Sequence, residues 1–198
     1  MVNGNEKVTV TGLYSGHNDR QRLEIKVGPS SSDHLKGFPE DTLEYNWKFY
    51  IDPDTKLTKD FFHIHQIKLV NEDESLPLIT FSGNGNNNHQ LFQVQYNPTG
   101  SQILILYKIN WQQVVGKWLV ASATVKYSVK PTEGLIKYQL KTLDGHQLFS
   151  YTNKTAQTLR EGSGGDQWAR PKWGLYRKLN QQLDRARVYF ADWSVVKI

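Results

Sequence analysis

The chain has 198 residues and no cysteine, which excludes disulfides, thiolate metal sites and cysteine nucleophiles. Apolar residues make up 38% of the sequence, enough for a hydrophobic core, and no stretch is long and apolar enough to span a bilayer. The formal net charge of +5 favours anionic partners. Basic helices, zinc-finger spacings and RNA-stacking motifs are missing, so we expect neither nucleic acid nor membrane among them.

Period-two alternation of apolar and polar residues predicts strands with one buried face over residues 22–27, 43–51 and 135–141. Residues 103–107 are apolar on both faces, which predicts a central strand covered on both sides. Asp144 and Gly145 predict a hairpin turn, residues 52–55, 83–88 and 97–101 predict turns or loops, and residues 153–160 have room for one short helical turn. The pattern predicts one all-β domain over residues 1–198, built from two packed antiparallel sheets.

The first polar strand face holds Arg22, Glu24 and Lys26. Its default interpretation is a surface charge ladder held by cross-strand pairs. The functional alternative is the wall of a cleft, in which Arg22 binds a substrate carboxylate.

Residues 61–70 form an apolar strand that places His63 and His65 on one face and Gln66 and Lys68 on the other, unless a bulge changes the alternation. Two histidines at this spacing can ligate a metal, but no third ligand of obvious spacing accompanies them. Amide and ammonium groups are costly to bury, so Gln66 and Lys68 fit a wet cleft.

The loop at residues 30–42 contains His34, either an inert surface histidine or a general base. Farther along, residues 172–178 place Lys172, Gly174 and Tyr176 on one face, with Trp173 on the packing face. A glycine here marks the close approach of a ligand or of another backbone, or a bulge. Phosphate loops, serine-hydrolase elbows, zincin motifs and a close carboxylate pair are not found in the sequence, which argues against those enzyme classes.

Five segments together resemble the glucuronan lyases of polysaccharide lyase family 20: "HLKG" (34–37), "EYNWKFYID" (44–52), "FFHIHQIK" (61–68), "RPKWGLYRKL" (170–179) and "VYFADW" (188–193). More distantly, "RLEIK" and "KWGLY" are similar to the R-x-E-L-R and K-A-G-x-Y strands of alginate lyases. The resemblance implies a β-jelly roll with a concave substrate groove, and β-elimination of an acidic polysaccharide, above all β-1,4-glucuronan.

The resemblance also implies roles for individual residues. Elimination from a uronate needs neutralisation of the carboxylate, a base for the C5 proton and an acid for O4. Arg22 and Gln66, helped by Lys68 or Lys172, suit the carboxylate, and Tyr176 and His34 suit the proton transfers. Where H5 and O4 lie on one side of the ring, as in β-1,4-glucuronate, Tyr176 can serve as both base and acid. Where they lie on opposite sides, His34 would be the base. Further substrate contacts are expected from Glu24, Lys26, His65 and Tyr50.

The chemistry requires no cofactor, but members of this fold can carry structural calcium, for which Asp192 is the candidate ligand. We expect a secreted, extracellular monomer whose signal peptide is not part of this chain. Two alternatives stay open: a non-catalytic carbohydrate-binding jelly roll for acidic polysaccharides, and a glycoside hydrolase of the same architecture.

Overall fold

The computed structural model describes residues 19–70, 76–85, 89–160, 166–179 and 185–198. Within these residues the regular elements are almost entirely strands, with two single-turn 3-10 helices at Asp33–Leu35 and Trp111–Gln113. The strands are β1 (Arg20–Lys26), β2 (Thr42–Ile51), β3 (Phe62–Val70), β4 (Ile79–Gly85), β5 (Gln90–Tyr96), β6 (Leu104–Asn110), β7 (Trp118–Lys126), β8 (Gly134–Thr142), β9 (Gln147–Ala156), β10 (Trp168–Lys178) and β11 (Val188–Lys197).

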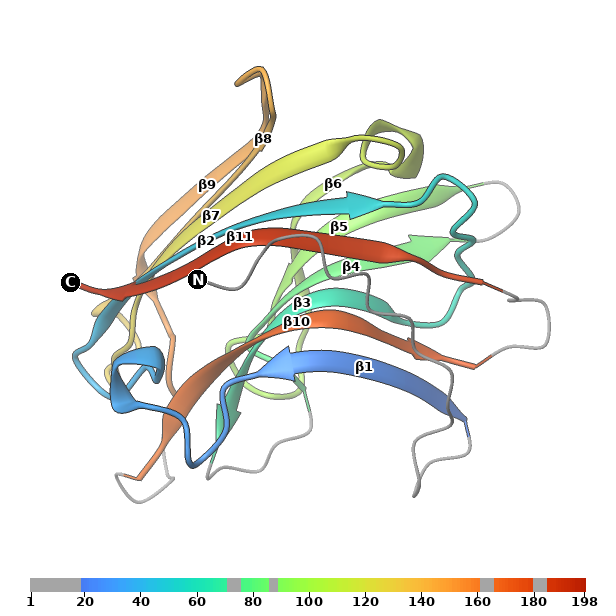
Figure 1. Cartoon of the computed structure of the whole chain (residues 1–198). Helices are drawn as coiled ribbons and strands as arrows, with labels where there is room; N and C mark the ends of the chain where they lie inside the picture. The colour runs from blue at the N-terminus through green and yellow to red at the C-terminus, as the bar shows by residue number, and fades with distance from the viewer. Residues whose placement is uncertain (1–18, 71–75, 86–88, 161–165, 180–184) are drawn as a thin grey trace.

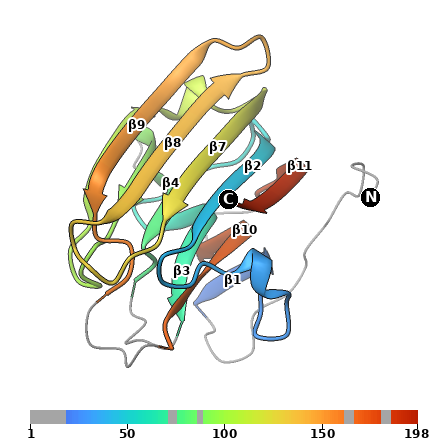
Figure 2. The same cartoon turned by 90° about the vertical axis from the view of Figure 1, so that its left-hand side faces the viewer.

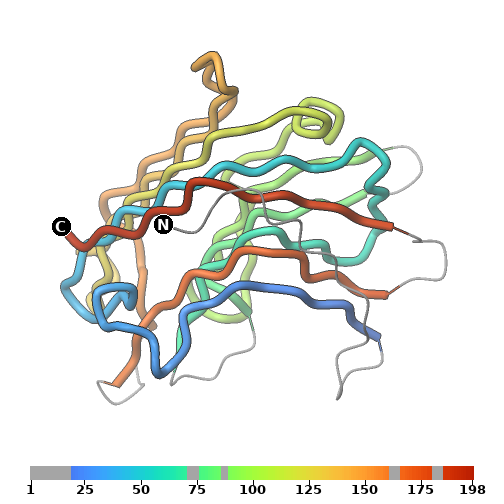
Figure 3. Tube along the Cα trace, in the orientation of Figure 1, coloured from blue at the N-terminus to red at the C-terminus, as the bar shows by residue number. Residues whose placement is uncertain are grey.

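The strands pair into two antiparallel sheets, which confirms the expected sandwich. One sheet has six strands in the order β1-β10-β3-β4-β5-β6, and the other has five in the order β11-β2-β7-β8-β9 (Figure 1). Strand β10 therefore lies between β1 and β3, and the Cα trace shows residues near the C-terminus beside residues near the N-terminus (Figure 3). Figure 2 shows the five-stranded sheet from its outer side.

The core lies between the sheets and is filled by the apolar face of each strand. In β2 the alternation is complete: Tyr45, Trp47 and Phe49 are buried, whereas Asn46 is exposed. Trp173 of β10 also packs inward, with ring centroids 6.5 Å from Tyr45 and 6.0 Å from Trp47. The polar residues of the same strands are thereby left on the outer faces of the sandwich.

Some local expectations are wrong and others are confirmed. Residues 83–85, expected in a turn or loop, form the end of strand β4. Residues 104–107 of the apolar run belong to an edge strand, β6, in which Leu104 and Ile105 are exposed, rather than to a central one. The first part of 153–160 continues β9 as strand and forms no helical turn. The hairpin between β8 and β9 turns where predicted, and Gly145 takes a positive φ of 88° there. No helix in the described part of the chain is long and apolar enough to cross a membrane.

Candidate active site

Strand register gathers polar side chains on the outer face of the six-stranded sheet. A first cross-strand row consists of Arg22, Tyr176, His63 and Ser82, from β1, β10, β3 and β4. A second row on the same strands consists of Lys26, Lys172, Gln66 and Thr80. Directly opposite residues of neighbouring strands point to the same side of a sheet, so each row is continuous. These two rows, together with Arg20 and Glu24 of β1, are called the polar cluster below.

Tyr176 lies between two guanidinium groups. Its phenolic oxygen accepts a hydrogen bond of 2.9 Å from Nη1 of Arg20. The guanidinium carbon of Arg22 lies 3.9 Å from the centroid of the phenol ring, a cation–π contact. The hydrogen bond with Tyr176 raises the pKa of Arg20 above its ordinary value. Sequence reasoning missed Arg20, although it lies two residues before Arg22 and therefore on the same strand face.

Glu24 is the carboxylate at the centre of the polar cluster, and its side chain is 5% exposed. Oε2 lies 3.5 Å from Nε of Arg22 and 3.8 Å from Nζ of Lys172. Oε1 accepts a hydrogen bond from Nε2 of Gln66. Arg22, Lys172 and Gln66 were all expected to hold a substrate carboxylate. In the structure all three contact the carboxylate of Glu24.

Gly174 lies opposite Glu24 and lets β1 and β10 approach closely. Its φ is +144°, and a Cβ added there would lie 2.0 Å from the carbonyl oxygen of Leu23. The pairing of β10 with β3 also shifts register between Trp173 and Tyr176. The structure therefore confirms two of the interpretations of this glycine, namely a bulge and the close approach of another backbone, that of β1.

Lys172 is buried within the polar cluster and is 4% exposed. Burial lowers its pKa to about 8, against the opposing effect of Glu24, and Arg170, Arg22 and Lys68 lower it further by repulsion. Lys68 and Arg170 are opposite neighbours in β3 and β10. The face thus holds more positive charge than its central carboxylate balances, and it is suited to a polyanion.

A bulge in β3 separates the two histidines that simple alternation places together. The pairing of β3 with β4 shifts register between His63 and His65, so Ile64 and His65 both face the core. His65 is 1% exposed, its ring centroid is 4.4 Å from that of Trp47, and its Nδ1 hydrogen-bonds to the carbonyl of Lys172. Burial lowers its pKa to about 3. His65 therefore has no open face toward a substrate, and the expected contact is corrected.

His63 takes the outward position instead, with its ring centroid 6.0 Å from that of Tyr176. Burial lowers its pKa to about 4, and the positive charges of Arg22 and Lys172 act in the same direction, so the ring is neutral near pH 7. The sequence offers His63 as a possible metal ligand and does not decide which histidine faces the groove. The signal that would have placed it on this face is the bulge, which strand periodicity does not contain.

A chain of hydrogen bonds determines which nitrogen of His63 carries the proton. The Thr80 hydroxyl donates to Oε1 of Gln95 at 3.1 Å, so it must accept at 2.7 Å from Ser82. The single proton of Ser82 is then used, so Ser82 accepts from Nδ1 of His63, also at 2.7 Å. His63 is therefore the Nδ1–H tautomer, with the lone pair on Nε2.

A pocket of about 250 Å³ adjoins His63 on the β4 and β5 side. Its polar lining is uncharged and includes the side chains of Thr80, Ser82 and Gln95. Leu76, Pro77 and Ile103 supply apolar lining. The pocket has the size and mixed lining of a site for part of a small organic group such as a sugar ring.

Two further predicted site residues, His34 and Tyr50, lie away from the polar cluster. The 3-10 helix that carries His34 lies beyond the carboxyl end of β1, whereas Tyr176 pairs near the start of that strand (Figure 1). The exposed His34 ring bonds to Ser32 at 2.7 Å. Tyr50 belongs to the other sheet, on its outer face, because its neighbours Phe49 and Ile51 point into the core. The expected contact of Tyr50 with a substrate at Tyr176 is therefore also corrected.

Asp192, the proposed calcium ligand, lies at a bulge in β11 and forms an ion pair of 2.6 Å with Lys48. Among the described residues, no group of three histidine or acidic side chains is arranged to hold a metal ion.

Comparison with known proteins identifies the fold. No protein-family model matches the chain, and no curated protein matches its sequence. Family 7 alginate lyase A1-II′ in complex with substrate superposes with a TM-score of 0.64 at 10% identity, covering 94% of this chain and 73% of that one.

Two further structures agree on the architecture. A GH131 β-glucanase catalytic domain from Podospora anserina gives a TM-score of 0.56 at 11% identity, over 92% of this chain and 66% of that one. An alginate lyase from Pseudomonas aeruginosa gives 0.50 at 13% identity, over 79% and 64%. The predicted all-β jelly roll is thereby confirmed.

Proposed function

We propose that this chain is a polysaccharide lyase that cleaves a uronate-containing polysaccharide by β-elimination, with β-1,4-glucuronan as its substrate. The observation that carries the proposal is the position of Tyr176, whose hydroxyl is hydrogen-bonded to Arg20 and whose ring lies under Arg22, in the same row as His63. The proposal includes the remaining expectations from the family 20 resemblance, namely secretion and a monomeric enzyme.

The first task in this reaction is to neutralise the uronate carboxylate, so that the C5 proton becomes acidic enough to remove. Arg22, Gln66 and Lys172 already surround the carboxylate of Glu24. In the proposal these donors also face the C6 carboxylate of the substrate, and Glu24 keeps them in place. Side-chain cations supply the charge, so no cofactor enters the reaction.

The second task is to move one proton. The phenolate form of Tyr176 takes H5; the electrons of the C5–H bond form the C4=C5 double bond, the C4–O4 bond breaks, and the proton passes from Tyr176 to O4, which regenerates the phenolate. In β-1,4-glucuronate H5 and O4 lie on the same side of the ring, so one group suffices. Arg20 stabilises the negative charge on the tyrosine oxygen. For a uronate whose H5 and O4 lie on opposite sides of the ring, His63, neutral and with its lone pair on Nε2, is the proposed base in place of His34.

The similarity to alginate lyases supports an acidic polysaccharide as the substrate class, and the basic polar cluster supports it independently. The test is the ultraviolet absorbance of unsaturated uronate ends during incubation with glucuronan, alginate or a heparin-type polymer. We expect absorbance to rise fastest with glucuronan. No rise with any of the three, at several pH values and with calcium added, would sink the proposal.

Tyr176→Phe separates the enzyme from the non-catalytic binding module. We expect it to lower turnover by about 10²–10⁴-fold, the usual contribution of a proton-transfer group, with binding to glucuronan retained. Tyr151→Phe, in β9 of the other sheet, is the matched control and should leave turnover unchanged. Binding by the wild-type chain without turnover would favour the binding module, and new reducing ends without absorbance would favour a hydrolase.

A further inference from the structure

The outer face of the five-stranded sheet carries a row of aromatic side chains. Tyr189, Tyr50 and Trp118 lie opposite one another on β11, β2 and β7. The ring centroid of Tyr50 is 5.9 Å from that of Trp118 and 5.9 Å from that of Tyr189. All three side chains are half-buried, so the row keeps part of its ring surface open to solvent. Such an extended aromatic platform suits a flat, partly apolar ligand.

The rows beside the aromatic row are polar and ordered. The next row places Lys48 on β2 and Lys141 on β8. The row after that is uncharged and consists of Ser194, Asn46, Ser122, Gln139 and Ser150. A fourth row includes Glu44 and Lys137. No described helix or strand crosses this face in Figure 2.

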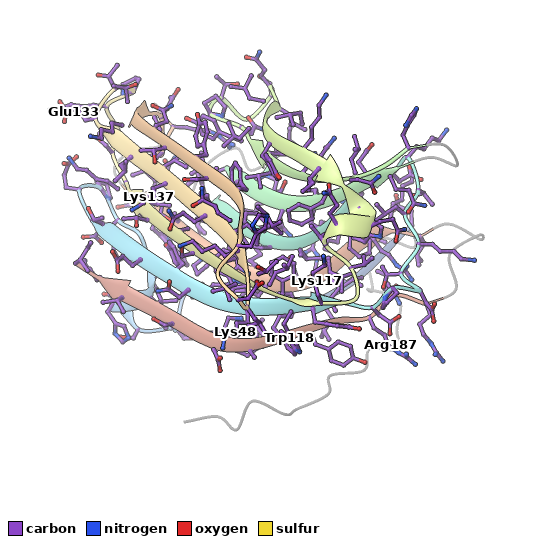
Figure 4. The ribbon with its side chains drawn as sticks, turned by 90° about the horizontal axis from the view of Figure 1, so that it is seen from above. Lys48, Lys117, Trp118, Glu133, Lys137 and Arg187 are labelled. Atoms are coloured by element: carbon purple, nitrogen blue, oxygen red, sulfur yellow. The ribbon has the colours of Figure 1, made fainter. Side chains whose placement is uncertain are left out.

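The charge of this face is mostly positive. Figure 4 shows Lys48, Lys117, Trp118 and Arg187 gathered at one end of the sheet and Lys137 farther along it. Lys48 pairs with Asp192 at 2.6 Å and Arg187 with Asp52 at 3.2 Å. Within the described residues, Lys117, Lys137 and Lys141 form no ion pair with an acidic side chain. A flexible polyanion can engage these lysines without displacing a carboxylate.

We propose that this outer face, defined by Tyr50, Trp118, Tyr189, Lys137 and Lys141, is a second glycan-binding surface that holds a strand of acidic polysaccharide. The aromatic row stacks against sugar rings, the uncharged row bonds to their hydroxyls, and the lysines pair with their carboxylates. The surface is on the opposite side of the sandwich from Tyr176, so it anchors the polymer and does not take part in its cleavage. The inference requires binding alone and does not depend on lyase activity.

The test is affinity electrophoresis in gels that contain glucuronan, with Tyr176→Phe in every chain so that the polymer stays intact. Tyr50→Ala/Trp118→Ala should weaken apparent affinity at least about fivefold, equivalent to about 1 kcal/mol. Trp193→Ala is the matched control, because this tryptophan is 41% exposed in the same sheet but lies outside the aromatic row, and it should migrate as the parent.

A second pair of substitutions guards against a folding defect. Lys137→Gln/Lys141→Gln leaves the aromatic row and the core intact and should also weaken retardation and flatten its dependence on salt. Unchanged retardation of both double variants would overturn the inference. The assignment to acidic polysaccharide would be overturned if neutral amylose retarded the parent as strongly as glucuronan does. It would also be overturned if single-stranded DNA retarded the parent and glucuronan did not.

Cleavage of a short glucuronate oligosaccharide, in chains that retain Tyr176, keeps the two proposals separate. We expect Tyr50→Ala/Trp118→Ala to leave this cleavage unchanged. If no chain cleaves but retardation still depends on the aromatic row, the lyase proposal fails and the second surface stands. If cleavage occurs and retardation is indifferent to the row, the reverse holds.

Discussion

At the scale of single residues, the geometry favours a different histidine for the proposed proton-transfer role. His63 lies beside Tyr176 and has a defined tautomer, whereas His34 is bonded to Ser32 beyond the end of β1. We therefore expect His63→Gln to lower kcat by about 10²-fold, the lower range for a lost acid–base group, on a uronate polymer in which H5 and O4 lie on opposite sides of the ring. The fall should be smaller on glucuronan, where Tyr176 serves as both base and acid. His34→Gln is the control and should retain activity. A lower kcat for His34→Gln than for His63→Gln would contradict this assignment.

The pKa of Lys172 predicts how substrate binding changes in alkaline solution. Burial lowers this pKa to about 8, so the ammonium group is charged below that pH and neutral above it. A neutral Lys172 attracts a uronate carboxylate less, so KM for glucuronan should rise as the pH increases through about 8. Lys172→Arg should move this rise to higher pH, because a guanidinium stays protonated.

The control for this pH dependence is Lys178→Arg, at the end of the same strand, where the lysine pairs with Asp60. It should leave the pH dependence of KM as in the wild-type chain. The measurement is KM between pH 7 and pH 10, about two units beyond the pKa of Lys172. A KM that does not change over this range would contradict the role of Lys172 in holding the carboxylate.

At the scale of elements, the contact between β1 and β10 depends on Gly174. A Cβ there would collide with the β1 backbone, and the φ of +144° is strained for any other residue. Gly174→Ala should therefore cost about 1–3 kcal/mol of unfolding free energy and move Glu24 away from Lys172, with loss of activity. Denaturant unfolding and turnover of the same preparation measure both effects.

Gly145→Ala is the comparison, because this glycine also has a positive φ, +88°, but a Cβ there meets nothing within 4 Å. It should cost about 1–2 kcal/mol for the left-handed backbone alone and leave turnover unchanged. Equal loss of turnover in both variants would show that general destabilisation, rather than the β1–β10 contact, accounts for the effect.

The elements also show what the sequence could predict. Alternation placed Arg22, Gln66, Lys172 and Tyr176 correctly on polar faces, because period two follows directly from strand geometry. The same rule placed His65 with His63, since a one-residue bulge leaves no trace in a hydrophobic pattern. Tyr50 could not be assigned to a sheet, because pairing between distant strands decides which outer face a residue joins.

The apolar run at 103–107 illustrates the same limit. Its composition is that of a covered strand, yet β6 lies at the edge of its sheet. Ile103 lines the pocket beside His63, so one apolar side chain of this run has a place at the site rather than in the core. Composition alone does not distinguish a buried strand from an edge strand that borders a pocket.

At the scale of the whole molecule, the sandwich separates two polar faces by one hydrophobic core. The six-stranded sheet presents Tyr176 and its cations, and the five-stranded sheet presents Tyr50, Trp118 and its lysines. A long polymer can contact both faces, whereas a short oligosaccharide occupies one at a time. The net charge of +5 adds attraction that no single contact supplies.

This arrangement predicts that salt affects polymer and oligosaccharide differently. Exposed charges interact over about 30 Å at 0.01 M salt but only about 3 Å at 1 M. Raising salt from 0.01 M to 1 M should therefore lower kcat/KM on long glucuronan by about tenfold or more, the size of electrostatic steering of an anionic substrate. On a glucuronate tetrasaccharide the fall should be smaller, because the buried contacts around Lys172 are screened less. Initial rates at fixed pH measure both, and an equal fall for the two substrates would contradict a contribution from charge outside the Tyr176 site.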